Sequence, residues 1–290
     1  MSGTQAPCRS CRVETELVEA SYRGSGVSIR RFDKLGAYST RTVVGLAALL
    51  LAACESAPVA IANKQSAKTV FPAADRPVAQ IVSSRWSTEE ARDRLKEAET
   101  VMDKAAIRPG MTVADIGAGE GYYTIRLAQR VGAEGRVLAE DIVPGVRDAL
   151  AQRVSRERLD NVSVRLGLPE DPRLPANSFD RVLMVHMYHE IASPYEFLWH
   201  LRPAVKVDGA VVVVDADRAT QNHGTPPALL ECEFAAVGYR LVERQPMPSA
   251  GGYVALFRPD GARPDPRAIV PCRTDRAGAE APAAVANDTP

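Results

Sequence analysis

Three alternating glycines, Gly117, Gly119 and Gly121, lie in the stretch "TVADIGAGEGYYT", between a short apolar run and a helical pattern. A loop that joins a strand to a helix in this way lies at the carboxyl end of the strand, where open α/β sheets bind ligands. Asp115 and Glu120 flank the loop, and two carboxylates repel a pyrophosphate but attract a positively charged ligand. The loop therefore favours a nucleoside that carries an ammonium or a sulfonium group, although the glycine spacing alone is equally typical of a tight turn.

The glycine spacing differs from that of two common phosphate-binding loops. A dinucleotide fingerprint needs glycine where this chain has Tyr122, and no Gly-Lys-Ser/Thr follows as it would in a P-loop. A nicotinamide-dependent reductase would have to bind pyrophosphate here, so it is kept only as an alternative.

A further acid, Asp141 in "VLAEDI", ends the next apolar run. A carboxylate at this place can accept two hydrogen bonds from the hydroxyls of a ribose. Ile142 follows it and is assigned to the same ligand site. The alternative is that Asp141 is a helix N-cap or a loop acid.

A cluster of polar residues, "HMYHE", follows a later apolar run and is expected to enter the pocket of a second substrate. Neutral histidine is a suitable general base near pH 7. We favour His189 for this role, with His186 and Glu190 as further candidates. Alternatively, His186 packs against the nucleoside and Glu190 caps a helix.

The elements that must position these residues alternate between strand and helix patterns, which predicts an α/β fold with a mostly parallel, doubly wound sheet. The last two strands are too close in sequence for a crossover helix and are expected to form an antiparallel edge hairpin. Ser87 and Glu90 form a capping box that predicts a helix to about Ala106. The predicted strands are 112–116, 136–141, 162–166, 181–186, 210–214, 239–245 and 253–258, and the further helices are 122–131, 145–155, 194–204 and 226–236.

From residue 107 to residue 258 the chain resembles the class I S-adenosylmethionine-dependent methyltransferases. "VADIGAGEG" is similar to their first motif, "VLAEDI" to the second, and "EDPRLPANSFDRVLMV" to the third and fourth. "LRPAVKVDGAVVVVD" is similar to the fifth, with Lys-Val-Asp-Gly in place of Lys-Pro-Gly-Gly. The resemblance implies a single Rossmann-like domain with a seven-stranded sheet and S-adenosylmethionine as the cofactor. It implies that the methionine part is surrounded by the first-motif residues and the ribose by Asp141; the first-motif residues are Asp115, Gly117, Gly119, Glu120 and Gly121.

The expected adenine site departs from the family pattern. Many members have an acid directly after the glycine equivalent to Gly167, but here Leu168 and Pro169 intervene, and proline has no N–H to donate. We expect Glu170 to accept from the adenine amine and the amide of Asp171 to donate to the ring.

A sulfonium is already an activated electrophile, so the reaction needs an aligned nucleophile and little else. The predicted reaction is in-line methyl transfer to a small-molecule or lipid-like acceptor. "HMYH" replaces the Asn/Asp-Pro-Pro-Tyr/Phe motif of amino-group methyltransferases, which argues against adenine-N6 or glutamine substrates. Asp215 and Asp217 would suit a catechol-type metal site, but His186 stands where the partner acid is expected, and no metal is predicted.

Composition supports one globular domain that does not bind nucleic acid. The 290 residues have a formal net charge of zero and a hydrophobic fraction of 46%, without a basic run next to aromatic residues. The cysteines are too scattered for a disulfide framework, and Cys8 and Cys11 lack the second pair of a zinc site.

The segment "STRTVVGLAALLLAACES" resembles a bacterial lipoprotein signal, in which Cys54 would be lipidated and would attach the protein to a membrane of the cell envelope. Otherwise a cytoplasmic location is expected. The predicted divisions are a disordered extension, 1–40, upstream of the true start; the signal, 41–54; a linker, 55–85; the methyltransferase domain, 86–259; and a disordered tail, 260–290. Because S-adenosylmethionine is made in the cytosol, a non-catalytic envelope lipoprotein that keeps the fold as a binding module is the alternative function.

Overall fold

The computed structural model describes residues 70–81 and 88–273 of the chain. These residues belong to one compact unit, which comprises residues 63–290. The predicted extension, the signal segment and Cys54 lie outside the described residues.

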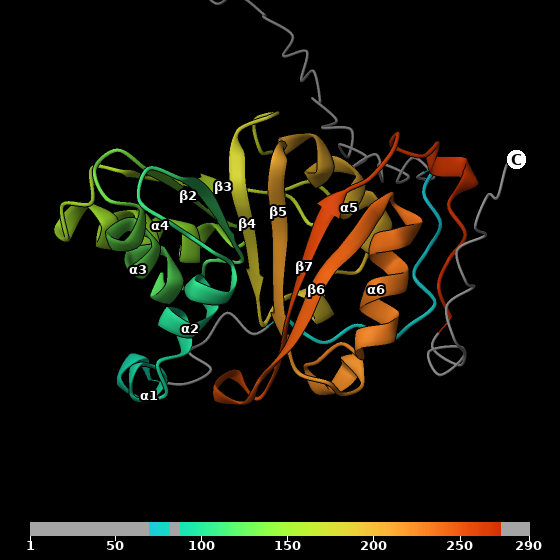
Figure 1. The fold of residues 1–290 in the computed structure, drawn as a ribbon, viewed down its shortest axis with the longest axis horizontal. Helices are drawn as coiled ribbons and strands as arrows, with labels where there is room; N and C mark the ends of the chain where they lie inside the picture. The colour runs from blue at the N-terminus through green and yellow to red at the C-terminus, as the bar shows by residue number, and fades with distance from the viewer. Residues whose placement is uncertain (1–69, 82–87, 274–290) are drawn as a thin grey trace, which may run out of the picture. The chain divides into compact units, whose positions relative to one another are not determined.

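The core of this unit is a seven-stranded sheet with the strand order β3-β2-β1-β4-β5-β7-β6 (Figure 1). The strands pair in parallel from β3 to β5, and β7 runs antiparallel to both β5 and β6. This confirms the predicted fold class, with β7 inside the sheet and β6 at its edge. The strands are β1 (Thr112–Ile116), β2 (Arg136–Asp141), β3 (Val162–Leu166), β4 (Phe179–Val185), β5 (Val205–Asp215), β6 (Tyr239–Met247) and β7 (Gly252–Pro259).

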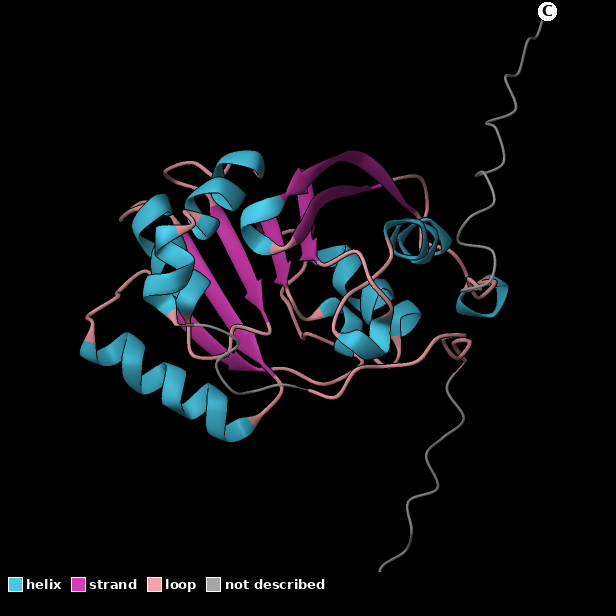
Figure 2. Cartoon of the chain, turned by 90° about the horizontal axis from the view of Figure 1, so that it is seen from below, coloured by secondary structure: helices cyan, strands magenta, loops and turns pink. Residues whose placement is uncertain are grey.

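Helices cover both faces of the sheet (Figure 2), because the central strands are apolar on both sides. Successive residues of β1 show this: Val113 packs with α2 and α3, whereas Ala114 packs with α5 and α6. Helix α4 packs beside β2 on the face of α3, and α6 lies along β6 (Figure 1). The helices of this region are α1 (Glu89–Arg94), α2 (Glu97–Lys104), α3 (Tyr122–Val131), α4 (Pro144–Arg156), α5 (Pro194–Leu201) and α6 (Pro227–Ala236).

The single helix predicted before the first strand is two helices. Lys96 adopts a left-handed conformation with φ of 51°, which ends α1 and turns the chain into α2. Thr88 is the N-cap, and its hydroxyl accepts from the N–H of Ala91, in place of the predicted Ser87, which lies outside the described residues. The turn buries Glu97 to 4% exposure, which a continuous amphipathic pattern does not predict.

Residues 70–81 are packed against the domain, so the prediction of a linker to residue 85 is wrong for this part. The Arg76 guanidinium donates to the Glu233 carboxylate over 2.8 Å and to the carbonyl of Ile191 over 3.1 Å. Both side chains of the ion pair are fully buried. A buried arginine has to be paired, and its partner on α6 is 157 residues away in the sequence.

The predicted disordered tail is wrong for residues 260–273. Ile269 is buried against the core, and Arg202 donates to the carbonyls of Asp260 and Gly261 over 2.9 and 2.7 Å. Cys272 forms a disulfide with Cys232 of α6, a single cross-link that the scattered cysteines did not predict. The cross-link and these contacts hold a segment whose own sequence has little apolar periodicity.

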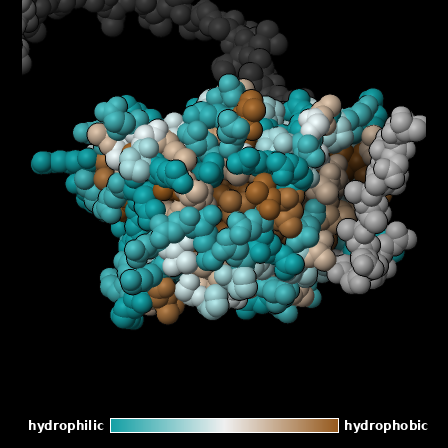
Figure 3. Space-filling model, viewed as in Figure 1, coloured by the Kyte–Doolittle hydropathy of each residue, from teal (hydrophilic) through white to brown (hydrophobic). Residues whose placement is uncertain are grey.

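One face of the described region is largely polar (Figure 3). Figure 3 shows a mostly hydrophilic face with an apolar area near its centre. Among the described residues, none of the helices has the length and apolar character of a membrane span.

Candidate functional site

A pocket of about 260 Å³ opens at the carboxyl ends of β1, β2 and β4. The chain order reverses between β1 and β4, which is the point where open α/β sheets bind ligands. The structure brings to this pocket seven of the predicted site residues: Gly117, Gly119, Glu120, Asp141, Ile142, His186 and Glu190.

Asp141 is held in place by the loops on either side of it. Its Oδ2 accepts from the N–H of Gly119 over 3.0 Å, and its Oδ1 accepts from the N–H of Val143 over 2.9 Å. An ionised carboxylate has about four lone-pair sites, so two remain for the hydroxyls of a ligand. The glycine loop and the end of β2 are thus fixed relative to each other through one side chain.

The first two glycines of the loop are required by its backbone. Gly117 has φ of +65° and Gly119 has φ of +55°, and a Cβ at Gly117 would lie 3.1 Å from the Met187 side chain. Gly121, which was predicted to contact the cofactor, lies at the start of α3. It is the N-cap of α3 and does not line the pocket, because it packs so closely that a Cβ there would lie 2.5 Å from Leu150 Cδ1.

Asp115 is not among the residues that line the pocket either, although it was predicted to lie beside the ligand. Strand alternation turns it toward α3, where the hydroxyl of Thr124 donates to its Oδ2 over 2.6 Å. It is 3% exposed, and burial raises the pKa of Asp115 to about 6. Its structural role is therefore to join β1 to α3.

Glu140 lines the pocket and was not predicted. It is 1% exposed, and its Oε1 has no hydrogen-bond partner among the described residues. Burial, followed by the charge of Asp141, raises the pKa of Glu140 to about 8. An acid inside an otherwise apolar run was the signal in the sequence, since burial of such a group is costly unless it has a use.

The predicted adenine contacts are not in place. Glu170 is exposed, and neither Glu170 nor Asp171 lines the pocket, although Pro169 does. The N–H of Asp171, which we expected to serve the adenine ring, donates to the carbonyl of Leu168 over 3.1 Å. A tight turn between residues 168 and 171 therefore uses this amide in the structure.

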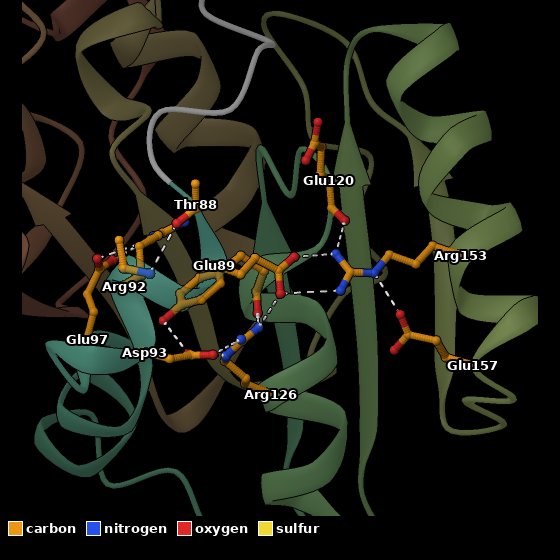
Figure 4. A network of polar contacts seen from close by, with 11 residues as sticks. Thr88, Glu89, Arg92, Asp93, Glu97, Glu120, Arg126, Arg153 and Glu157 are labelled. Atoms are coloured by element: carbon orange, nitrogen blue, oxygen red, sulfur yellow. Dashed lines mark hydrogen bonds and ion pairs between the residues drawn. The ribbon is translucent and has the colours of Figure 1, made fainter. Parts of the chain in front are cut away.

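Helix α1 forms a further wall of the pocket, which sequence reasoning also missed. Glu89 contacts two helices at once: its Oε1 lies 2.6 Å from an Arg153 nitrogen of α4, and its Oε2 lies 3.1 Å from an Arg126 nitrogen of α3. Arg153 also donates to the carbonyl of Glu120 over 2.8 Å, so the network joins α1 to the glycine loop (Figure 4). The acidic first turn of α1 was the signal for this role.

The basic side chain of α1 that lines the pocket, Arg92, is neutralised. It pairs with Glu97 over 2.6 Å and stacks 3.8 Å above the ring of Tyr122. Glu97 Oε1 also lies 3.7 Å from Nε2 of His186. Burial alone would raise the pKa of Glu97, but its close contacts with His186 and Arg92 lower it to about 2.

His189, the favoured general base, lies outside this pocket. It is 2% exposed, and its Nδ1 lies 3.0 and 3.1 Å from the two carboxylate oxygens of Asp215. The short 3₁₀-helix η1 (Tyr188–Glu190) turns it inward while Glu190, the next residue, reaches the pocket. His189 and Glu190 are neighbours in this turn, and their side chains point in different directions, so Glu190 lines the pocket and His189 does not.

The lining fits a nucleoside that carries a positively charged sulfur. Carboxylates from two strand ends can accept from hydroxyl and ammonium groups, and no lysine is found among the described lining residues. The positive-φ loop lets the backbone approach a ligand closely. The apolar part of the lining, which includes Ile142, Ile191 and Phe197, suits a flat ring system.

Comparison with known proteins identifies the central part of the chain. Residues 113–209 match a family model described as a methyltransferase domain. Nocamycin O-methyltransferase from Saccharothrix syringae is 40% identical over 85 residues, which are 29% of this chain and 30% of that protein. Ubiquinone/menaquinone biosynthesis C-methyltransferase UbiE from Hydrogenovibrio crunogenus is 29% identical over 126 residues, 41% of this chain and 48% of that protein. The chain thus spans less than half the length of these two relatives.

A solved structure supports the fold. A SAM-dependent methyltransferase from Aquifex aeolicus superposes with a TM-score of 0.51 at 22% identity, covering 59% of this chain and 97% of that one. The matched residues 113–209 begin in β1 and end within β5, so they contain the glycine loop, Asp141 and the residues after β4. Residues 113–209 therefore match a methyltransferase domain, and the glycine loop, Asp141 and the residues after β4 within this range line the pocket.

Proposed function

We propose that the protein is an S-adenosylmethionine-dependent methyltransferase that acts on a small-molecule or lipid-like acceptor. One observation carries the proposal: the glycine loop and the Asp141 carboxylate, hydrogen-bonded to each other, line one pocket within the matched methyltransferase domain. The non-catalytic alternative gains no support from these relatives, whose names are those of enzymes.

The cofactor, when bound, supplies a methyl group on a sulfonium that is already activated for displacement. Asp141 would accept from the ribose hydroxyls with the lone pairs that its two backbone donors leave open. Glu120 and the loop backbone would surround the methionine part, and Arg92, paired with Glu97, lines the side toward α1.

His186 and Glu190 are the candidates for taking a proton from the acceptor, because both line the pocket after β4. His186 is held in a left-handed conformation with φ of 54°, which directs its ring toward Glu97. A base is needed if the acceptor is a hydroxyl or an activated carbon. The names of the relatives, an O-methyltransferase and a quinone C-methyltransferase, support such acceptors. A nucleic-acid acceptor is not proposed, since the chain has no net charge.

Calorimetric titration of the full-length protein with S-adenosylhomocysteine and with NADH tests this function. We expect binding of the first compound only, and an Asp141→Asn variant should bind it about tenfold more weakly, because a charge-assisted hydrogen bond is worth about 1.5 kcal/mol or more. Asp148→Asn is the matched control, since this acid lies on α4 outside the pocket with a side chain 60% exposed. Binding of NADH alone, or equal affinities of the two variants, would contradict the proposal.

We also propose that the protein is exported and attached through Cys54. The Cys232–Cys272 disulfide supports this, because such cross-links persist in oxidising compartments and are rare in the cytosol. Cys54 and the signal-like segment lie outside the described residues, so the support for export comes from the sequence resemblance together with the disulfide.

A further inference from the structure

Three side chains with metal-ligating atoms meet beside the pocket. One ligand atom each from His189, Glu190 and His223 lies within 4.8 Å of the other two. His189 and Glu190 belong to η1 after β4, and His223 follows the 3₁₀-helix η3 (Thr220–Asn222) after β5. The cluster therefore lies at the same edge of the sheet as the pocket, and Glu190 belongs to both.

His189 is oriented as a ligand. Its Nδ1 faces the Asp215 carboxylate, so Nε2 is the nitrogen that remains for an ion. Asp215 is fully buried and is itself fixed, since it accepts from the hydroxyl of Thr225 over 2.7 Å and from the N–H of Ala216 over 2.8 Å. A carboxylate that holds the second nitrogen of a histidine is the usual support of a metal-binding imidazole, because it sets the tautomer and the ring orientation.

The backbone around the cluster is braced. His223 is held in a left-handed conformation with φ of 57°, and its ring lies perpendicular to that of His189, with centroids 5.4 Å apart. The segment 70–81 spans both short helices: the N–H of Ala79 donates to the carbonyl of His189 over 3.1 Å, and the hydroxyl of Thr220 donates to the carbonyl of Pro77 over 2.6 Å. These contacts keep the two histidines at the same site.

We propose that His189 Nε2, Glu190 and His223 bind a divalent transition-metal ion of the zinc class. Two imidazoles and one carboxylate are a ligand set that such ions favour over Mg²⁺ or Ca²⁺, which prefer oxygen ligands. Ligand atoms on a tetrahedral ion lie about 3.3 Å apart, so the three must close by about 1.5 Å at most. Closing this distance requires movement of the Glu190 and His223 side chains, which are only partly buried.

The site would have an open position, because three protein ligands leave one for water or an acceptor oxygen. It differs from the catechol-type site considered from the sequence, since Asp215 orients His189 and Asp217 is not part of the cluster. The proposal does not depend on methyl transfer. It replaces the expectation that no metal is bound.

The test is titration of untagged full-length protein with Zn²⁺ by calorimetry and with Co²⁺ by absorption spectroscopy. We expect one Zn²⁺ per chain with micromolar or tighter affinity, and a Co²⁺ spectrum without thiolate charge-transfer bands. His223→Ala should weaken binding at least about 100-fold, and Asp215→Asn about tenfold or more. His200→Ala is the matched control, since this histidine lies on α5 outside the cluster.

The outcomes separate this site from the cofactor pocket. Each variant is also titrated with S-adenosylhomocysteine, and its thermal unfolding is measured with and without Zn²⁺. Zn²⁺ should raise the melting temperature of the wild type and of His200→Ala, but not that of His223→Ala. If His223→Ala does not fold, Glu190→Gln replaces it, with the same loss expected. Absence of Zn²⁺ binding by the wild type, or equal binding by a folded cluster variant, would overturn the metal site whatever the cofactor result.

Discussion

Glu140→Gln is expected to make the protein more stable, and increasingly so as the pH rises. Glu140 is 1% exposed, and its carboxyl group lies so close to Gly167 that a Cβ at this glycine would clash with Oε1. Burial, and then the charge of Asp141, raises the pKa of Glu140 from the ordinary 4.5 to about 8. Glutamine has the same shape and stays neutral, so the substitution removes the ionisation and little else.

The sign and the size of this pH-dependent change in the free energy of unfolding follow from proton linkage. The folded state holds the Glu140 proton more tightly than the unfolded state, so this group stabilises the fold fully below pH 4.5 and the stabilisation is lost as the pH rises through about 8. At about 1.4 kcal/mol per pH unit, the whole interval corresponds to about 5 kcal/mol. Between about pH 5.5 and about pH 8.5, the ionisation of Glu140 is expected to account for about 3 kcal/mol of this loss in stability.

Urea unfolding of the full-length protein under non-reducing conditions measures the free energy of unfolding at each pH. The free energy of unfolding of Glu140→Gln minus that of the wild type should grow by about 3 kcal/mol from about pH 5.5 to about pH 8.5. Glu134→Gln, on the exposed turn between α3 and β2, is the matched control and should show no such growth. A constant difference for Glu140→Gln would mean that the group is ionised throughout, and the reasoning about its burial would be refuted.

Two further predictions concern the cysteines. Replacing both Cys232 and Cys272 by serine removes a cross-link between residues 40 apart in sequence. The free energy of unfolding in urea should fall by about 4 kcal/mol. A double variant as stable as the wild type would show that the disulfide contributes nothing to stability. Mass spectrometry of the protein from the membrane fraction should find Cys54 as a lipidated first residue, whereas peptides that continue across Cys54 in the mature protein would rule out this anchor.

The secondary structure could be predicted closely because its signals are local. The predicted ranges of β1, β2, β3 and α3 agree with the structure residue for residue. Runs of β-branched residues separated by Gly and Pro define strands, and a capped periodic stretch defines a helix, without reference to distant residues. The glycine loop and Asp141 could be placed for the same reason, since they occupy the ends of recognisable strands.

The packed ends of the domain could not be predicted from local pattern. Arg76 occurs in a stretch that is poor in apolar residues, and its burial depends on Glu233, which is far away in sequence. Cys272 likewise has its partner 40 residues away. In both segments the stabilising contacts are long-range, so composition alone indicated disorder.

The direction of each polar side chain also depended on the packed structure. Asp115, Asp141 and His189 all lie at or near the carboxyl ends of strands, as predicted. Asp115, however, contacts Thr124 and His189 contacts Asp215, whereas Asp141 lines the pocket. Sequence shows which residues end a strand, because alternation and turn chemistry act within a few residues. Whether a carboxylate or an imidazole faces a ligand or a buried partner depends on which donors other segments bring within about 3 Å, and that is settled only when the sheet and its helices pack together.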